Sequence, residues 1–360
     1  MKEFICRLCP RNCGALRGKE GKGWCGMGAE PRIARAAPHY DEEPVISGER
    51  GSGTVFFSGC SLKCCFCQNF ELSHHGYGET VSVERLREIY FELIAQGVHN
   101  INLVNPTHHA EAVYESLEGG LPVPVVWNSG GYEKVETLRR VEGRVQVYLP
   151  DLKYISAESA RKYSRAADYF DYAAPAIREM LRQTGPVELD ENGIIRRGTI
   201  IRHLILPGCA RESMRILDFI HDELPGAWVS LMAQYLPFGE AEGVDELGRR
   251  LTQEEYDMVA DHLLELGMED GFIQELSSSD EKYIPKFDLS GVKPREQDKE
   301  EDFYQWNCAF RRSSAVRAAT RSTWAAAIPT YWWTPGFPEQ ESPMSWKRSA
   351  CIPASFPPYW

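Results

Sequence analysis

The chain has 360 residues, a formal net charge of −12, 43% hydrophobic residues and 26% charged residues, a composition typical of a soluble globular protein. The negative charge argues against a nucleic-acid partner, which would need a basic surface. We find no apolar run of about 18 residues that would span a membrane, and the N-terminus carries cysteines where a signal peptide has its apolar core. We therefore expect a cytoplasmic protein without a membrane partner.

Residues 1–50 contain the first of two cysteine groups, made of Cys6, Cys9, Cys13 and Cys25 among many glycines and little hydrophobic periodicity. Because disulfides are rare in the cytosol, clustered thiols there usually bind metal or do chemistry. The sequence predicts a small Cys-rich N-terminal region held by metal rather than by its own core. Zinc, a second iron–sulfur cluster and reduced free thiols all stay open.

Residues 51–292 alternate between strands and helices. Short apolar runs predict strands at 53–59, 100–105, 123–128, 145–150, 199–207, 228–237 and 270–277. Amphipathic stretches predict helices at 83–97, 134–143, 156–165, 212–224 and 251–268. This alternation implies βαβ units and a parallel sheet, hence the α/β class. At least six such units favour a barrel or a partial barrel of the TIM type, with its chemistry at the C-terminal ends of the strands. We expect the partial (β/α)6 barrel.

The second cysteine group directly follows the first of these strands. Cys60, Cys64 and Cys67 have the spacing Cys-x3-Cys-x2-Cys, and three thiolates on a short loop can hold three irons of a cubane cluster while the fourth stays open to a ligand. Zinc sites usually use four ligands in paired spacings, so this loop suits zinc poorly. We interpret Cys65 as a packed thiol and Phe66 as a shield for the cluster.

Residues 293–360 differ in character from the rest of the chain. They hold six of the nine tryptophans, and from residue 308 onward the only acids are Glu339 and Glu341. Weak periodicity and frequent prolines predict a disordered or non-homologous tail. An aromatic docking segment is the alternative, and we assign the tail no function.

The loop Gly-Cys-Ser-Leu-Lys-Cys-Cys-Phe-Cys-Gln-Asn at 59–69 resembles the signature of the radical S-adenosylmethionine superfamily. The wider segment 42–74 resembles the PflX-like branch related to pyruvate formate-lyase activating enzymes, and the resemblance covers roughly residues 3–292. It implies a 4Fe-4S cluster at Cys60, Cys64 and Cys67 that reductively cleaves S-adenosylmethionine to a 5′-deoxyadenosyl radical.

The resemblance also implies S-adenosylmethionine contacts at the ends of two strands. After the second strand, relatives have a Gly-Gly-Glu motif that binds the methionine amino group, whereas this chain offers Asn105 and Thr107 as polar contacts. The turn after the third strand is similar to the family's Thr-Asn-Gly turn, which makes Asn128 and Ser129 candidates.

Further contacts are implied on the later strands. Asp151 and Lys153 alternate with an apolar residue and so point to one face of their strand, where buried charges need a partner or a use. By resemblance they contact the ribose and carboxylate of the cofactor; a structural ion pair is the alternative. Arg202 would face the cofactor carboxylate, and Gln234 and Tyr235 are weaker candidates.

The resemblance implies an activase that abstracts hydrogen from a glycine of a partner enzyme. The implied partners are a reductant such as flavodoxin or ferredoxin, and a glycyl-radical enzyme or another protein substrate. Radical modification of another peptide or small molecule is the second hypothesis. A pure iron–sulfur electron carrier would need a fourth cysteine for each cluster.

Overall fold

The computed structural model describes residues 3–18, 21–278, 285–294 and 346–348, the last three by their main chain alone. The predicted tail at 293–360 lies outside the described residues except for 293–294 and 346–348. The interpretation of that tail therefore stays a prediction.

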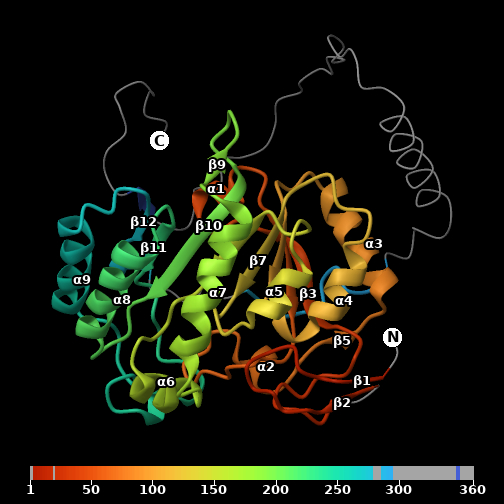
Figure 1. Cartoon of the computed structure of the whole chain (residues 1–360), viewed down its shortest axis with the longest axis horizontal. Coiled ribbons are helices and arrows are strands. Elements are labelled where there is room, and N and C mark those ends of the chain that lie inside the picture. Colours follow the sequence, from red (N-terminus) through yellow and green to blue (C-terminus); the bar gives the residue numbers. More distant parts are fainter. Residues whose placement is uncertain (1–2, 19–20, 279–284, 295–345, 349–360) are drawn as a thin grey trace. The chain divides into compact units, whose positions relative to one another are not determined.

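One large sheet forms the frame of the fold (Figure 1). Its hydrogen-bonded order is β5 (Glu79–Thr80), β3 (Arg32–His39), β4 (Ser52–Phe57), β6 (Ile101–Val104), β7 (Val125–Ser129), β8 (Val147–Pro150), β10 (Ile195–Leu204), β11 (Trp228–Met232), β12 (Gly271–Gln274) and β13 (Trp346–Arg348). All neighbours from β4 to β12 are parallel, whereas β3, β5 and β13 are antiparallel additions at the edges. The predicted α/β class with a parallel sheet is confirmed, and among the described residues the order does not close into a ring.

Two short pairings complete the strands. β9 (Glu188–Leu189) pairs antiparallel with β10, and β1 (Phe4–Ile5) pairs with β2 (Leu16–Arg17) in a separate two-stranded sheet.

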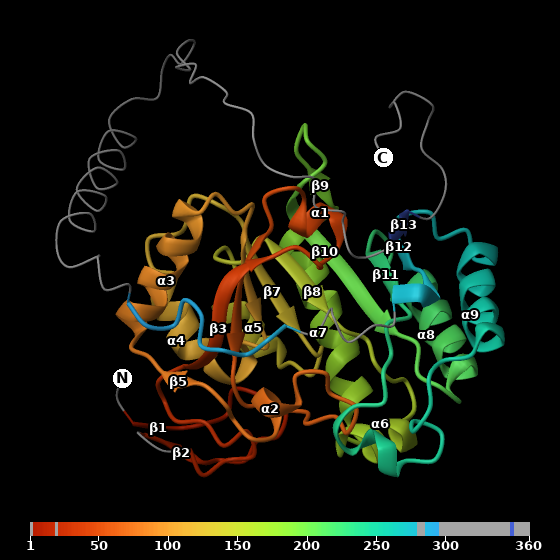
Figure 2. The same ribbon diagram turned by 180° about the vertical axis from the view of Figure 1, so that it is seen from behind.

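The parallel strands follow one another in chain order, and each connection contains a helix. Right-handed crossovers between sequential neighbours place such helices on one face of a sheet. These helices are α3 (Val83–Ala95), α4 (Ala110–Ser116), α5 (Val135–Arg140), α6 (Ala157–Ser164), α7 (Tyr169–Thr184), α8 (Ala210–Glu223) and α9 (Gln253–Glu265). In Figure 1 α5, α7 and α8 lie in front of the strands, and Figure 2 shows β7, β8 and β10 from the opposite face.

Shorter helical segments fill the connections: α1 (Pro44–Ser47), α2 (Phe70–Ser73), and the 3₁₀ turns Thr107–His109, Gly239–Gly243 and Leu276–Ser278. No helix in the described part of the chain has both the length and the apolar character needed to cross a membrane.

Alternation along the strands separates the two faces of the sheet. On β10, Ile201 belongs to the main apolar core, and His203 bonds to Ser213 of α8, so both residues face the helices. Arg202 lies between them and points to the other face, where it lines a cavity. We call the face that carries Arg202 the inner face.

The inner face is closed by α1 at the edge where the parallel strands begin. Val45 and Ile46 of α1 pack in one apolar cluster with Val126 of β7, Leu149 of β8 and Ile200 of β10. Pro44 at the first helical position suits this short helix because its ring already fixes a helical φ angle. The cavity therefore opens toward the other edge, where the strands end.

Among the elements that the sequence did not predict, β3 and α7 are the longest strand and the longest helix. β3 lies within the predicted Cys-rich region, yet its residues pair along the length of β4 in the main sheet. Arginines at 32 and 35 interrupt the apolar alternation that would have indicated a strand. α7 is the longest helix described, but Pro175 stands inside it, and an internal proline normally marks a helix boundary.

His203 gives a pH-dependent test of this packing. Its Nδ1–H donates to the Leu152 carbonyl at 2.7 Å, and its Nε2 accepts from the Ser213 hydroxyl at 2.8 Å, so the neutral ring is fully bonded. Burial lowers the pKa of His203 from 6.5 to about 4.

Below pH 6.5 the unfolded chain therefore binds a proton at His203 that the folded chain does not bind. Because of this difference, the free energy of unfolding falls as the pH falls. Between pH 6.5 and 4 this one residue should remove about 3 kcal/mol. Urea unfolding at several pH values gives the free energy of unfolding as a function of pH. Between pH 6.5 and 4 this free energy should fall less steeply with falling pH for His203→Gln than for the wild type. Replacement of the exposed His221 by Gln is the control, and equal slopes for wild type and His203→Gln would contradict the assignment.

Candidate functional site

A cavity of about 240 Å³ lies on the inner face near the ends of the parallel strands. It gathers nine of the residues that the sequence singled out: Cys60, Cys64, Cys67, Asn105, Asn128, Ser129, Asp151, Lys153 and Arg202. The three cysteines come from the loop after β4, and the polar residues come from β6, β7, β8 and β10 or the turns that follow them. Strand ends that meet at one edge of a parallel sheet explain why residues so distant in the chain share one cavity.

The cysteine loop begins with a backbone turn at Gly59. Its φ angle is +81°, and a Cβ there would lie 2.8 Å from the Cys25 carbonyl oxygen, so a side chain has neither the conformation nor the space. The Cys60 Sγ accepts the backbone N–H groups of Leu62 at 3.3 Å and Lys63 at 3.5 Å. Such N–H donors at a sulfur suit a thiolate or a metal-bound cysteine.

The other two cysteines of the loop are held from different sides. The Ser164 hydroxyl at the end of α6 donates to the Cys64 Sγ at 2.9 Å. Burial, together with the neighbouring Cys64 and Cys60, raises the pKa of Cys67 to about 12, and burial raises the pKa of Cys60. Metal binding at this loop therefore has to displace protons from the thiols.

Three thiols on one wall of a cavity, with further polar groups opposite, fit the donor set of an iron–sulfur cluster that keeps one iron open. In the described residues no group of three or more Cys, His, Asp or Glu side chains is arranged to hold a metal ion as it stands.

Arg202 is the centre of the polar wall. Its Nε donates to Asp151 Oδ1 at 2.9 Å, one terminal nitrogen donates to Asn128 Oδ1 at 2.6 Å, and the other pairs with Glu42 Oε2 at 3.3 Å. The Lys153 Nζ lies 2.5 Å from the second oxygen of Asp151. Burial alone would raise the pKa of Asp151, but the two cations outweigh burial and hold that pKa below its usual value.

Two neighbouring acids were missed by the sequence interpretation: Glu42, which lines the cavity, and Glu43, which is buried outside its lining. Glu42 is half-buried beside Arg202 and also accepts amide N–H groups from Asn102 at 3.1 Å and Asn128 at 3.2 Å. Burial raises the pKa of Glu43 to about 7. Both follow β3 and reach the inner face from the edge where the parallel strands begin. The only available signal was a Glu-Glu pair directly before Pro44 at the start of a short helix.

Thr107 does not line the cavity, unlike the other main candidates Asn105, Asn128, Ser129, Asp151, Lys153 and Arg202. It lies in the 3₁₀ turn after β6, is 2% exposed, and its hydroxyl donates to Glu133 Oε1 at 2.6 Å. The indole N–H of Trp127 donates to the same oxygen at 3.2 Å. Thr107 therefore serves the packing behind β7, whereas Asn105 lines the cavity and donates to the Gly59 carbonyl at 2.7 Å.

The weaker candidates divide in the same way. Gln234 lines the cavity, whereas Tyr235 points away and donates to the Leu247 carbonyl at 2.6 Å. Phe66 lines the cavity and contacts the Tyr235 ring at a centroid distance of 6.2 Å. Cys65 is buried outside the cavity lining, and its backbone N–H donates to the Tyr163 carbonyl at 2.8 Å.

The four N-terminal cysteines form a second group of thiols. Cys6, Cys9 and Cys25 are buried and Cys13 is exposed. Burial, with smaller contributions from the other three thiols, raises the pKa of Cys9 to about 12. The guanidinium of Arg17 lies 3.3 Å from the Cys25 Sγ and 3.8 Å from the Cys6 Sγ. Burial raises the pKa of Cys25, and the Arg17 cation opposes that shift only in part.

The fold and the cavity define an α/β protein with a cysteine-lined pocket at the C-terminal edge of a parallel sheet. No family model matches the chain. A solved structure with partial similarity is that of methylornithine synthase, with a TM-score of 0.44, 15% sequence identity, and coverage of 73% of this chain and 81% of that chain.

The chain is 32% identical over 262 residues to an uncharacterized protein of Methanocaldococcus jannaschii. The alignment covers 69% of this chain and 71% of that relative. The chain therefore belongs to the same family as the M. jannaschii protein.

Proposed function

We propose that the protein is a radical S-adenosylmethionine enzyme. The observation that carries this proposal is that Cys60, Cys64 and Cys67 share one cavity with the charged residues Asp151, Lys153 and Arg202. Cys60, Cys64 and Cys67 would hold a 4Fe-4S cluster, which together with S-adenosylmethionine would supply reductive cleavage of that cofactor to a 5′-deoxyadenosyl radical. The signature-like sequence of the loop supports the same conclusion.

Each residue of the cavity has a role in this proposal. The three cysteines bind the cluster, and Phe66 shields it from water. Asn105 holds the loop through the Gly59 carbonyl.

The charged wall binds the cofactor. Lys153 and Arg202 place two cations where a carboxylate can bind, while Asp151 keeps both fixed and offers an acceptor to hydroxyl groups. Asn128 and Ser129 add polar contacts at the end of β7. The electron comes from an external donor such as flavodoxin or ferredoxin.

The chemistry is tested by anaerobic reconstitution with iron, sulfide, dithionite and S-adenosylmethionine, followed by chromatography of 5′-deoxyadenosine. Cys64→Ala should abolish the product because it removes a cluster ligand. Cys65→Ala, its neighbour outside the cavity, should retain the product. Iron-loaded wild type that forms no 5′-deoxyadenosine would refute the proposal.

Within this chemistry we propose an activase-like role, in which the radical takes a hydrogen atom from a glycine of a partner enzyme. Support comes from the resemblance of segment 42–74 and of Asp151-Leu152-Lys153 to activating enzymes. Incubation of the reconstituted protein with a glycyl-radical enzyme from the same genome should give the EPR doublet of a glycyl radical. Turnover of S-adenosylmethionine without that doublet, for every such enzyme of the genome, would favour another peptide or a small molecule as substrate.

We also propose that Cys6, Cys9, Cys13 and Cys25 hold a second metal, either zinc or a second iron–sulfur cluster. Three buried thiols and an adjacent guanidinium support this site. Elemental analysis of the purified chain should find metal beyond that of the radical cluster, and Cys9→Ser should lose it. Cys209→Ser, a cysteine outside both groups, is the control. Equal metal contents in wild type and Cys9→Ser would contradict the second site.

A further inference from the structure

Arg11 joins two distant segments of the protein through peptide carbonyls. Its Nε donates to the Ser61 carbonyl at 2.7 Å, and a terminal nitrogen lies 3.3 Å from the Leu62 carbonyl. The same guanidinium donates to the carbonyls of Ser164, at 2.9 Å, and Arg165. The first two carbonyls belong to the cysteine loop between Cys60 and Cys64, and the last two end α6.

Both segments need such a donor. The last carbonyls of a helix have no partner within the helix, and the negative end of the helix dipole favours a cation there. Carbonyls of a tight loop likewise need donors when water has little access to them. A planar guanidinium with five N–H groups can serve both ends at once and thereby fix their spacing.

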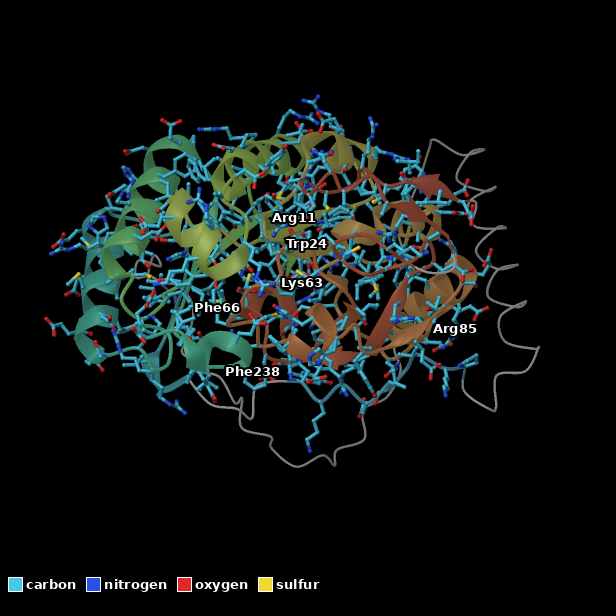
Figure 3. The ribbon with its side chains drawn as sticks, turned by 90° about the horizontal axis from the view of Figure 1, so that it is seen from below. Arg11, Trp24, Lys63, Phe66, Arg85 and Phe238 are labelled. Atoms are coloured by element: carbon cyan, nitrogen blue, oxygen red, sulfur yellow. The ribbon has the colours of Figure 1, made fainter. Side chains whose placement is uncertain are left out.

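The position of Arg11 is set by the Cys-rich region. Arg11 lies between Cys9 and Cys13 in the sequence, and its guanidinium contacts the Trp24 ring at 4.1 Å from the centroid. Figure 3 shows these two side chains together. On the side of the main sheet, the Tyr132 ring lies 5.4 Å away. The aromatic contacts orient the plane of the guanidinium.

The contact between the cysteine loop and the end of α6, which Arg11 bridges, includes Cys64, one of the three proposed cluster ligands. The Ser164 hydroxyl donates to the Cys64 Sγ at 2.9 Å, and the Cys65 N–H donates to the Tyr163 carbonyl. The end of α6 is therefore bonded to the loop both directly and through Arg11. Hydrogen bonds to ligand sulfur atoms tune the reduction potential of an iron–sulfur cluster.

We propose that Arg11 is a positioning residue that fixes the cysteine loop against the end of α6 and thereby keeps the Ser164 hydroxyl on Cys64. The Cys-rich region thus controls the reducibility of the cluster and the placement of its open iron. This inference rests on the proposed radical chemistry at the Cys60–Cys67 loop. It assigns a task to the N-terminal region that is independent of which metal that region binds.

The test compares Arg11→Gln, Arg11→Lys and Ser164→Ala with the wild type after anaerobic reconstitution of the full chain. Loss of a hydrogen bond to sulfur makes the reduced cluster less stable, so EPR-monitored redox titration should show a lower potential for Ser164→Ala. Arg11→Gln should also lower the reduction potential. Arg11→Lys, which keeps the charge, should lower it less. The rate of 5′-deoxyadenosine formation in Arg11→Gln should fall roughly 10- to 100-fold because the loop is displaced.

The exposed Arg7, in the same region, supplies the control: Arg7→Gln should match the wild type in potential, EPR spectrum and rate. An Arg11→Gln protein with wild-type potential, spectrum and rate would overturn the inference. Wild type that holds a cluster but forms no 5′-deoxyadenosine would refute the radical chemistry alone, because the shift in potential still reports on Arg11. If Arg11→Gln does not fold, Trp24→Leu, which removes the aromatic contact, should give the same shift, and its absence would equally overturn the inference.

Discussion

The pairing of one guanidinium on the inner face, that of Arg202, constrains the strand register and the position of α1. The Arg202 side chain lies on the inner face of the sheet and is only 16% exposed. An unpaired charge there would be costly, and Asp151, Asn128 and Glu42 accept its hydrogen bonds. Each partner comes from a different segment: the end of β8, the end of β7, and the turn before α1. The strand register and the position of α1 must both be correct before this cation is paired. Removal of Asp151 or Glu42 would take away part of the negative charge that compensates this cation.

This constraint also separates the two faces of the sheet in function. A one-residue shift in β10 would exchange Arg202 with Ile201 or His203, so the alternation that builds the core also aims the cation at the cavity. On the face of β10 that packs against the helices, His203 is instead bonded on both ring nitrogens, to Leu152 and to Ser213. The cavity lies at the strand ends on the inner face, where charged groups compensate one another and a mostly buried loop supplies the cysteines.

The success of sequence interpretation depended on how local each signal was. The spacing of Cys60, Cys64 and Cys67 lies within one loop, and the pairing of Asp151 with Lys153 follows from two-residue periodicity, so both were predictable. Thr107 was misplaced because a 3₁₀ turn begins there and carries its hydroxyl to a buried acid behind β7. Glu42 was missed because β3 sets its position, and the sequence did not predict β3. Two arginines interrupt the apolar alternation of that strand, so its antiparallel pairing with β4 became visible only in the structure.

The Cys-rich region was predicted as a unit held by metal, but its contacts tie it to the main sheet. Arg17 is 1% exposed and donates both to the Cys25 sulfur and to the His108 carbonyl at the start of α4. The Cys25 carbonyl lies where a side chain on Gly59 would stand. A region with so little apolar core gains order from these contacts as well as from any metal. Because the Cys25 carbonyl packs against Gly59, the residue directly before Cys60, the two cysteine groups are joined through packed backbone.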